Sequence, residues 1–139
     1  MSLAERWFPG PLKELSEDEC FELLAAASVG RVGYTDPDGP VILPVNYTVD
    51  NRTVLFRTAP QNSLALHVRS GPAAFEVDEA DDYTQSGWSV LVRGSASFLD
   101  SEDLPADPDD RPSPWAEGTR SLVVRITPRV VTGRRLLPR

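Results

Sequence analysis

Hydrophobic and polar residues alternate along the stretch VILPVNYTVDNRTVLFRT, which spans residues 41–58. A period of two is typical of half-buried strands, so the stretch predicts two antiparallel strands joined by a tight turn at Asp50-Asn51. The residues expected on one face of the first strand are Val41, Leu43, Val45, Tyr47 and Val49. In the second strand, residues 53–58, those expected on one face are Val54, Phe56 and Thr58, opposite Leu55 and Arg57.

Two features of this stretch are unusual for a plain hairpin. Pro44 falls in the middle of the first strand, and because proline has no backbone N–H it predicts a sheet edge or a bulge. At the end of the second strand, Arg57 and Thr58 lead through a polar loop into a helix predicted over residues 62–70. A guanidinium is a planar donor fork and the first amides of a helix are unpaired, so the sequence predicts an anion site here.

The same patterns organise the rest of the chain. Ser16 and Glu19 predict a capping box at the start of a helix that ends at Gly30. Further strands are predicted over residues 31–35, 72–78, 87–99 and 122–127, with a last extended piece over 130–136. The segment 87–99 is expected to be the longest strand and to bend at Gly94, and residues 79–86 and 100–118 are expected to be loops. These elements predict a mainly β protein, a small barrel of six antiparallel strands with a few short helices.

Length and composition narrow the class of protein. A chain of 139 residues with 40% hydrophobic and 25% charged residues indicates one globular domain. We expect an N-terminal arm over residues 1–14 and the domain over residues 15–139. The net charge of -7 argues against nonspecific binding of nucleic acid. The sequence shows no signal peptide and no apolar stretch approaching the ~20 residues of a membrane span, so we expect a cytoplasmic protein without a membrane partner.

Few side chains suggest catalysis or metal binding on their own. Cys20 is the single cysteine and His67 the single histidine, which excludes a disulfide framework and disfavours a zinc site. We interpret Cys20 as a buried apolar residue and His67 as a surface or dimer-contact residue. No side chain stands out as a nucleophile or general base, which suits an enzyme whose cofactor carries the chemistry.

An ordered set of short motifs extends over nearly the whole chain from about Leu15. In order they are Gly30-Arg31-Val32, Pro44-Val45-Asn46-Tyr47, Phe56-Arg57-Thr58, Ala74-Phe75-Glu76-Val77-Asp78, Gly87-Trp88-Ser89-Val90 with Gly94, and Thr132-Gly133-Arg134-Arg135. This set resembles the pyridoxamine 5′-phosphate oxidase-like flavoproteins, and its Asn46-Tyr47 and Phe56-Arg57-Thr58 steps look closest to the nitroimidazole-reductase-like subgroup. The resemblance implies a six-stranded split β-barrel that forms a homodimer, with FMN bound in grooves between the subunits.

The resemblance also assigns roles to individual residues. It implies that Pro44, Val45, Asn46 and Tyr47 lie along the flavin ring, and that Arg57, Thr58 and Ser63 hold the phosphate. Ser89 matches a position that offers a polar side chain to the flavin. Trp88 and Trp115 are expected to wall the groove, and Arg134 matches the arginine of the terminal motif. Taken singly, each of these residues also fits a purely structural role.

The chain departs from the family pattern at two places. Many members carry a basic residue at the position of Ser63 or Leu64, and this chain carries none there. The terminal histidine and arginine contacts of true pyridoxamine phosphate oxidases are absent, which argues against vitamin B6 synthesis. The sequence therefore favours an FMN-dependent oxidoreductase acting on a small aromatic or nitro-bearing substrate. Two alternatives stay open: a noncatalytic protein that binds or sequesters flavin or haem, and a reductase that uses a deazaflavin cofactor.

Overall fold

The computed structural model describes residues 11–60, 62–68, 71–114 and 122–138 of the chain. Most of the expected N-terminal arm and Trp115 therefore lie outside the described residues. The helices and strands, in chain order, are β1 (Leu12–Glu14), α2 (Glu17–Ala26), β2 (Val29–Asp36), β3 (Gly39–Asn46), β4 (Thr48–Asp50), β5 (Thr53–Thr58), α3 (Ser63–Val68), β6 (Pro72–Asp81), β7 (Ser86–Leu99), the 3-10 helices η1 (Ser101–Asp103) and η2 (Pro108–Asp110), and β8 (Leu122–Leu136). Within these residues, no helix is long and apolar enough to cross a membrane.

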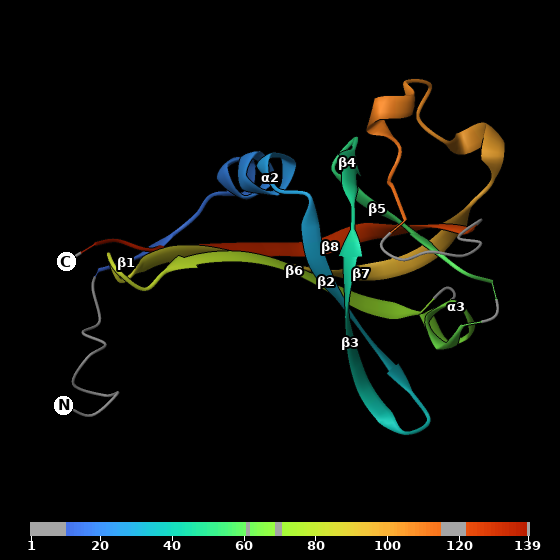
Figure 1. Ribbon diagram of the computed structural model, residues 1–139, viewed down its shortest axis with the longest axis horizontal. Helices are drawn as coiled ribbons and strands as arrows, with labels where there is room; N and C mark the ends of the chain where they lie inside the picture. The colour runs from blue at the N-terminus through green and yellow to red at the C-terminus, as the bar shows by residue number, and fades with distance from the viewer. Residues whose placement is uncertain (1–10, 61, 69–70, 115–121, 139) are drawn as a thin grey trace.

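The strands form one strongly curled antiparallel sheet, as Figure 1 shows. Its strand order is β3-β2-β6-β7-β8-β5-β4, and β1 pairs with β8 outside this path. The two ends of the order, β3 and β4, are consecutive in the chain and are separated by Tyr47 alone. The sheet therefore curls back on itself as a half-barrel, and the mainly β split-barrel class predicted from the sequence is confirmed.

The strand count differs from the predicted six, because the described sheet has eight strands. The stretch expected to form one strand from Val41 to Val49 divides at Tyr47, since β3 pairs with β2 while β4 pairs with β5. A change of hydrogen-bonding partner leaves no mark on the alternation of side chains, which continues through the break. The remaining addition is β1, whose three residues lie opposite residues 134–136 of β8.

A β-bulge bends the two longest strands at the predicted position. Arg93 lies opposite Val130 and Gly94 opposite Pro128, which leaves Arg129 of β8 without a partner in β7. A side chain at position 94 would place its Cβ atom 2.0 Å from the carbonyl oxygen of Thr127, so only glycine fits. The longest strand is nevertheless β8, with 15 residues, because the two predicted pieces 122–127 and 130–136 join through the bulge.

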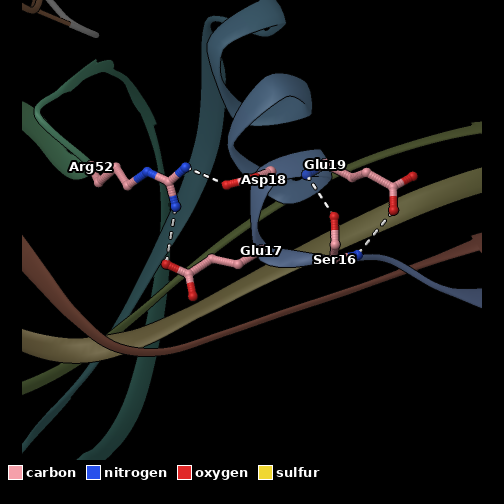
Figure 2. Close-up of polar contacts among 5 residues, drawn as sticks. All are labelled: Ser16, Glu17, Asp18, Glu19 and Arg52. Carbon is pink, nitrogen blue, oxygen red and sulfur yellow. Dashed lines mark hydrogen bonds and ion pairs between the residues drawn. The ribbon is translucent and has the colours of Figure 1, made fainter.

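Helix α2 begins where the sequence predicts and ends earlier. The backbone N–H of Ser16 donates to Glu19, whose own N–H donates to the Ser16 hydroxyl, so the capping box is confirmed (Figure 2). The helix ends at Ala26 rather than at Gly30, which belongs to β2. A Cβ atom at position 30 would lie 2.3 Å from the ring of Phe75. Gly30 therefore makes room for a core aromatic and has no part in ending the helix.

The β4–β5 hairpin is tied to this helix. Its two-residue turn is formed by Asn51 and Arg52, one position beyond the predicted Asp50-Asn51, and both have positive φ angles of 50° and 60°. As Figure 2 shows, the Arg52 guanidinium reaches Glu17, at 3.2 Å, and Asp18 in the first turn of α2. The same group lies 4.9 Å from the centre of the Phe21 ring. These contacts fix the helix against the hairpin that carries Arg57.

The barrel interior holds the main hydrophobic core. It is made of alternate residues of the strands together with the inner faces of α2 and α3; its fully buried members include Leu24, Val32, Val54, Phe56, Phe75, Val90, Val92, Val124 and Ile126. We call the opposite side of the sheet the outer face. At one end of the molecule the segment 100–114, which we call the strap, lies beside β4 and β5 (Figure 1). There Leu55 and Val123 are buried although they lie on the outer face.

Candidate functional site

The strand β3 ends the sheet order and presents an apolar edge. Its Pro44 lies opposite Arg31 of β2, so the proline costs no hydrogen bond to a further strand, and the predicted edge position is confirmed. Ile42 and Leu43 are 71% and 36% exposed, which is unusual for large aliphatic residues in a small domain. An exposed apolar edge of this kind is suited to covering by a flat ligand or a second chain.

Residues 44–47 point alternately to the outer face and the core. Val45 and Tyr47 are 5% and 4% exposed and belong to the core cluster. The Tyr47 ring meets Phe75 edge-on at 4.8 Å, and burial raises the pKa of Tyr47 to about 12. Asn46 faces outward, where its side-chain amide donates to the carbonyl of Pro114 at 3.2 Å. Of these four residues, the side chains of Pro44 and Asn46 are therefore the ones available on the outer face.

The three residues predicted to hold a phosphate have different surroundings. Arg57 lies on the outer face, and its Nε–H donates to the carbonyl of Pro112 in the strap at 2.7 Å. Thr58 is 2% exposed, and its hydroxyl accepts a hydrogen bond of 2.7 Å from the Asn62 side chain. In the described part of the chain, the Nε bond is the one hydrogen bond of the Arg57 guanidinium. Within those residues its two terminal amino groups have no hydrogen-bond partner.

Ser63 lies in a polar cluster of its own. Its hydroxyl accepts from the Tyr34 hydroxyl and donates to a carboxylate oxygen of Asp36, each at 3.2 Å. A carboxylate beside the hydroxyl repels a phosphate, so this position is poorly suited to anion binding. Arg57 and Asn46 thus both bond backbone carbonyls of the strap, whereas Ser63 bonds Tyr34 and Asp36 instead.

A second group of predicted residues lies at the other end of the long strands. Ser89 of β7 is directly opposite Arg134 of β8, and Trp88 is adjacent to them. Two cavities, of about 370 and 300 Å³, open here, and Ser89, Arg134 and Leu12 line both. Trp88 lines the smaller cavity. These cavities are therefore lined by apolar, hydroxyl and cationic groups.

The two groups are far apart within one chain. Arg57 pairs with Val123, which pairs with Leu99 at the far end of β7 from Ser89. Ten residues of extended strand separate Leu99 from Ser89, which is roughly 30 Å. Figure 1 shows the same separation, with β1 at one end of the molecule and the strap and α3 at the other. Trp115, the remaining predicted site residue, lies outside the described residues.

Sequence reasoning missed a charged cluster on the outer face between these groups. Arg31 of β2 forms ion pairs with Glu76 at 3.2 Å and Asp78 at 3.5 Å, both from β6. Burial raises the pKa of Glu76 to about 7, with a contribution from the neighbouring Asp78 carboxylate, while Arg31 opposes the shift. The alternation of β6 placed Glu76 and Asp78 on one face, but the register with β2 was needed to bring Arg31 to them.

One more cavity, of about 350 Å³, lies on the outer face between β2, β3, β6 and the bulge. Ile42, Arg93 and Arg129 are among its lining residues, and none of the residues predicted from the sequence lines it. Within the described residues, no group of three or more histidine, cysteine, aspartate or glutamate side chains is arranged to hold a metal ion.

Comparison with known proteins identifies the family. The family model described as pyridoxamine 5′-phosphate oxidase matches residues 16–135. The chain belongs to the pyridoxamine 5′-phosphate oxidase family. This confirms the resemblance found in the ordered motifs. The match covers both groups of predicted site residues, from Pro44 to Arg134.

Individual members of the family are similar over nearly the whole chain. An uncharacterised protein of Mycobacterium tuberculosis is 35% identical over 129 residues, which are 89% of this chain and 85% of that protein. The structure of an FAD-binding protein from Mycobacterium smegmatis is 33% identical with a TM-score of 0.71, covering 91% of this chain and 99% of that one. A conserved protein of unknown function from Corynebacterium diphtheriae is 31% identical with a TM-score of 0.73 and the same coverage.

Proposed function

We propose that this chain binds a flavin, FMN in the first instance, in a groove between two copies of the chain and uses it to reduce a small aromatic or nitro-bearing substrate. The observation that carries the proposal is the division of the site. Arg57 and Asn46 lie at one end of the chain, and Ser89 and Arg134 line cavities at the other. A two-fold homodimer joins one end of each subunit to the other end of its partner.

The residues present are suited to a flavin. The apolar edge around Ile42 and Pro44 offers a surface for a flat ring system. Asn46 has an amide that is able to both donate and accept at a ring edge. The Nε of Arg57 bonds Pro112, and its two terminal amino groups, which have no hydrogen-bond partner among the described residues, would donate to a phosphate oxygen. The FAD-binding relative from M. smegmatis supports the same class of cofactor.

The bound flavin would supply hydride transfer. The protein's own residues would bind and orient it: Arg57 holds the phosphate, Asn46 meets the ring edge, and the Trp88 side chain of the other subunit excludes water from one side. No general base is required of the chain. Consistent with this, Glu76 forms an ion pair with Arg31, and the Ser63 hydroxyl donates to Asp36, so both side chains already have partners within their own subunit.

The first experiment is an absorption spectrum of the purified protein before and after FMN or FAD is added, combined with size-exclusion chromatography and light scattering. We expect a flavin spectrum that co-elutes with a dimer. Flavin binding would be refuted if the purified protein stays colourless after either flavin is added at a concentration well above the dissociation constants of typical flavoproteins. A deazaflavin or haem spectrum would instead support one of the alternatives.

Catalysis is tested separately from binding. The bound flavin is reduced with dithionite under anaerobic conditions, and a nitroaromatic compound is then added while flavin absorbance is followed. We expect reoxidation faster than that of free FMN at the same concentration. Reoxidation no faster than in the free-flavin control would leave a protein that binds flavin without catalysing the reaction.

A further inference from the structure

Two buried polar atoms lack hydrogen-bond partners in the described part of the chain: the Thr48 hydroxyl and the Arg125 Nε. They lie on one row across the outer face. Thr48 of β4 is opposite Leu55 of β5, which is opposite Arg125 of β8, which is opposite Ser97 of β7. Buried polar groups in native proteins almost always have a partner, so two orphans in one row indicate a missing ligand or ordered water.

Arg125 is a neighbour of Arg57 on this face. Arg57 is opposite Val123, two residues before Arg125, so the two arginines are diagonal neighbours across the β5–β8 ladder. The Cα atoms of such neighbours are roughly 7–8 Å apart, within reach of each other for long side chains. Two guanidinium groups can therefore converge on a single anion between β5 and β8.

Neither arginine has an acidic partner among the described residues. The ion pairs found there involve Lys13, Arg31 and Arg52, although the strap carries several carboxylates. Two like charges held side by side in a half-buried position repel each other. A dianion between them removes this repulsion and supplies the acceptors that the donors lack.

The row is open on one side. Leu55 is completely buried, whereas Ser97, on the other side of Arg125, is exposed. An anion can therefore reach Arg125 from the β7 side without displacing the strap. The bond between the Arg57 Nε and the Pro112 carbonyl fixes one arginine in place, which reduces the entropy lost on binding.

We propose that Arg57 and Arg125 together form a site for a phosphate monoester. Arg125 supplies the second cationic group, in place of the basic residue that is absent at Ser63 and Leu64. The proposal rests on the proposed flavin binding for the identity of the ligand, the terminal phosphate of FMN. The site chemistry itself depends only on the two arginines and the orphaned donors. Free phosphate is the other source of the same chemistry.

The test compares FMN with riboflavin, which has the same ring system without the phosphate. Affinities are measured by flavin fluorescence for the wild type, Arg125→Gln and the control Arg129→Gln. Arg129 is an exposed residue of the same strand, outside the site, and its substitution changes the charge equally. We expect Arg125→Gln to lose at least about tenfold in FMN affinity and nothing in riboflavin affinity, and the control to change neither. An unchanged FMN affinity, or an equal loss for riboflavin, would overturn the proposal.

A second measurement separates this inference from the proposed function. Inorganic phosphate is added at constant ionic strength, and the melting temperature is followed. We expect phosphate to raise the melting temperature of the wild type and the Arg129→Gln protein but not that of Arg125→Gln. If the wild type binds no flavin, this result still supports the anion site, while a wild type that ignores phosphate overturns it. If Arg125→Gln does not fold, Arg125→Lys is used instead. We expect phosphate to raise the melting temperature of Arg125→Lys less than that of the wild type, because lysine lacks the planar guanidinium. A rise equal to that of the wild type would contradict the proposed role of the Arg125 guanidinium.

Discussion

The hydroxyl of Tyr47 donates a hydrogen bond to the backbone carbonyl of Leu24, with 2.5 Å between the two oxygen atoms. Leu24 lies in the last turn of α2, where carbonyls have no partner within the helix. Tyr47 is the residue at which β3 gives way to β4, and its own backbone N–H donates to the carbonyl of Ser28 at 3.1 Å. One buried side chain therefore connects the end of the helix to the point where the sheet changes partner.

Replacing Tyr47 with phenylalanine should reduce stability without reducing flavin affinity. The ring and its contact with Phe75 remain, but the buried carbonyl of Leu24 loses its donor, which costs roughly 1–2 kcal/mol in the free energy of unfolding. Urea denaturation measures the stability, and an FMN titration measures the affinity. Tyr83→Phe, at a residue that is 96% exposed, is the control and should change neither. A loss of FMN affinity with unchanged stability would instead place the Tyr47 side chain in the binding site.

Replacing Arg57 with alanine should have the opposite pattern. We expect FMN affinity to fall by more than about tenfold, equivalent to about 1.4 kcal/mol, because a charge-assisted bond to the phosphate is lost. The melting temperature of the protein without flavin should change little, since the bond lost among the described residues is that to the Pro112 carbonyl of the strap. Isothermal titration and thermal unfolding of the same preparation measure both. An FMN affinity equal to that of the wild type would show that the phosphate binds elsewhere.

Local sequence signals predicted the parts of the fold that local physics decides. The Ser16–Glu19 capping box, the edge position of Pro44 and the bend at Gly94 each depend on a few neighbouring atoms. The break at Tyr47 depends on which strands lie beside each half of the stretch, and alternation carries no information about that. The sequence predicts a helix end at Gly30 because glycine commonly stands there, but the close approach of Phe75 is what requires glycine at this position.

The candidate site was harder to predict from the sequence, because it depends on which face each residue occupies and on which strands are neighbours. Alternation already placed Thr58 on the face shared by Val54 and Phe56, which the structure shows to be the core. The sequence nevertheless places Thr58 and Arg57 in one anion site because they are adjacent at the strand end, whereas adjacent residues of a strand point to opposite faces. Arg125 carries no sequence signal, because its importance comes from the β5–β8 register that places it diagonally to Arg57.

Replacing Glu76 with glutamine should weaken the pH dependence of stability near neutral pH. The pKa of Glu76 is raised from 4.5 to about 7, so the folded protein holds this proton more tightly than the unfolded chain. Its contribution to stability is therefore present in full below about pH 4.5 and is lost as the pH rises through about 7. The wild type should lose more melting temperature between pH 5 and pH 8 than Glu76→Gln does. Glu79→Gln, an exposed carboxylate of the same strand, is the control, and equal slopes for Glu76→Gln and the wild type would contradict the shift.

Pairing two binding-deficient variants tests whether the site is shared between subunits. Arg57→Ala and Arg134→Ala should each bind FMN weakly, because each removes a cation from one of the two separated groups. When equal amounts are unfolded together and refolded, random pairing makes half of the dimers mixed. In a mixed dimer with shared sites, one site carries both substitutions and the other carries neither, so about one quarter of all sites should regain wild-type affinity. If each site is built within one chain, every site keeps one substitution and no high-affinity binding returns. Each variant refolded alone is the control, and a protein that is monomeric by light scattering at micromolar concentration would exclude the shared site altogether.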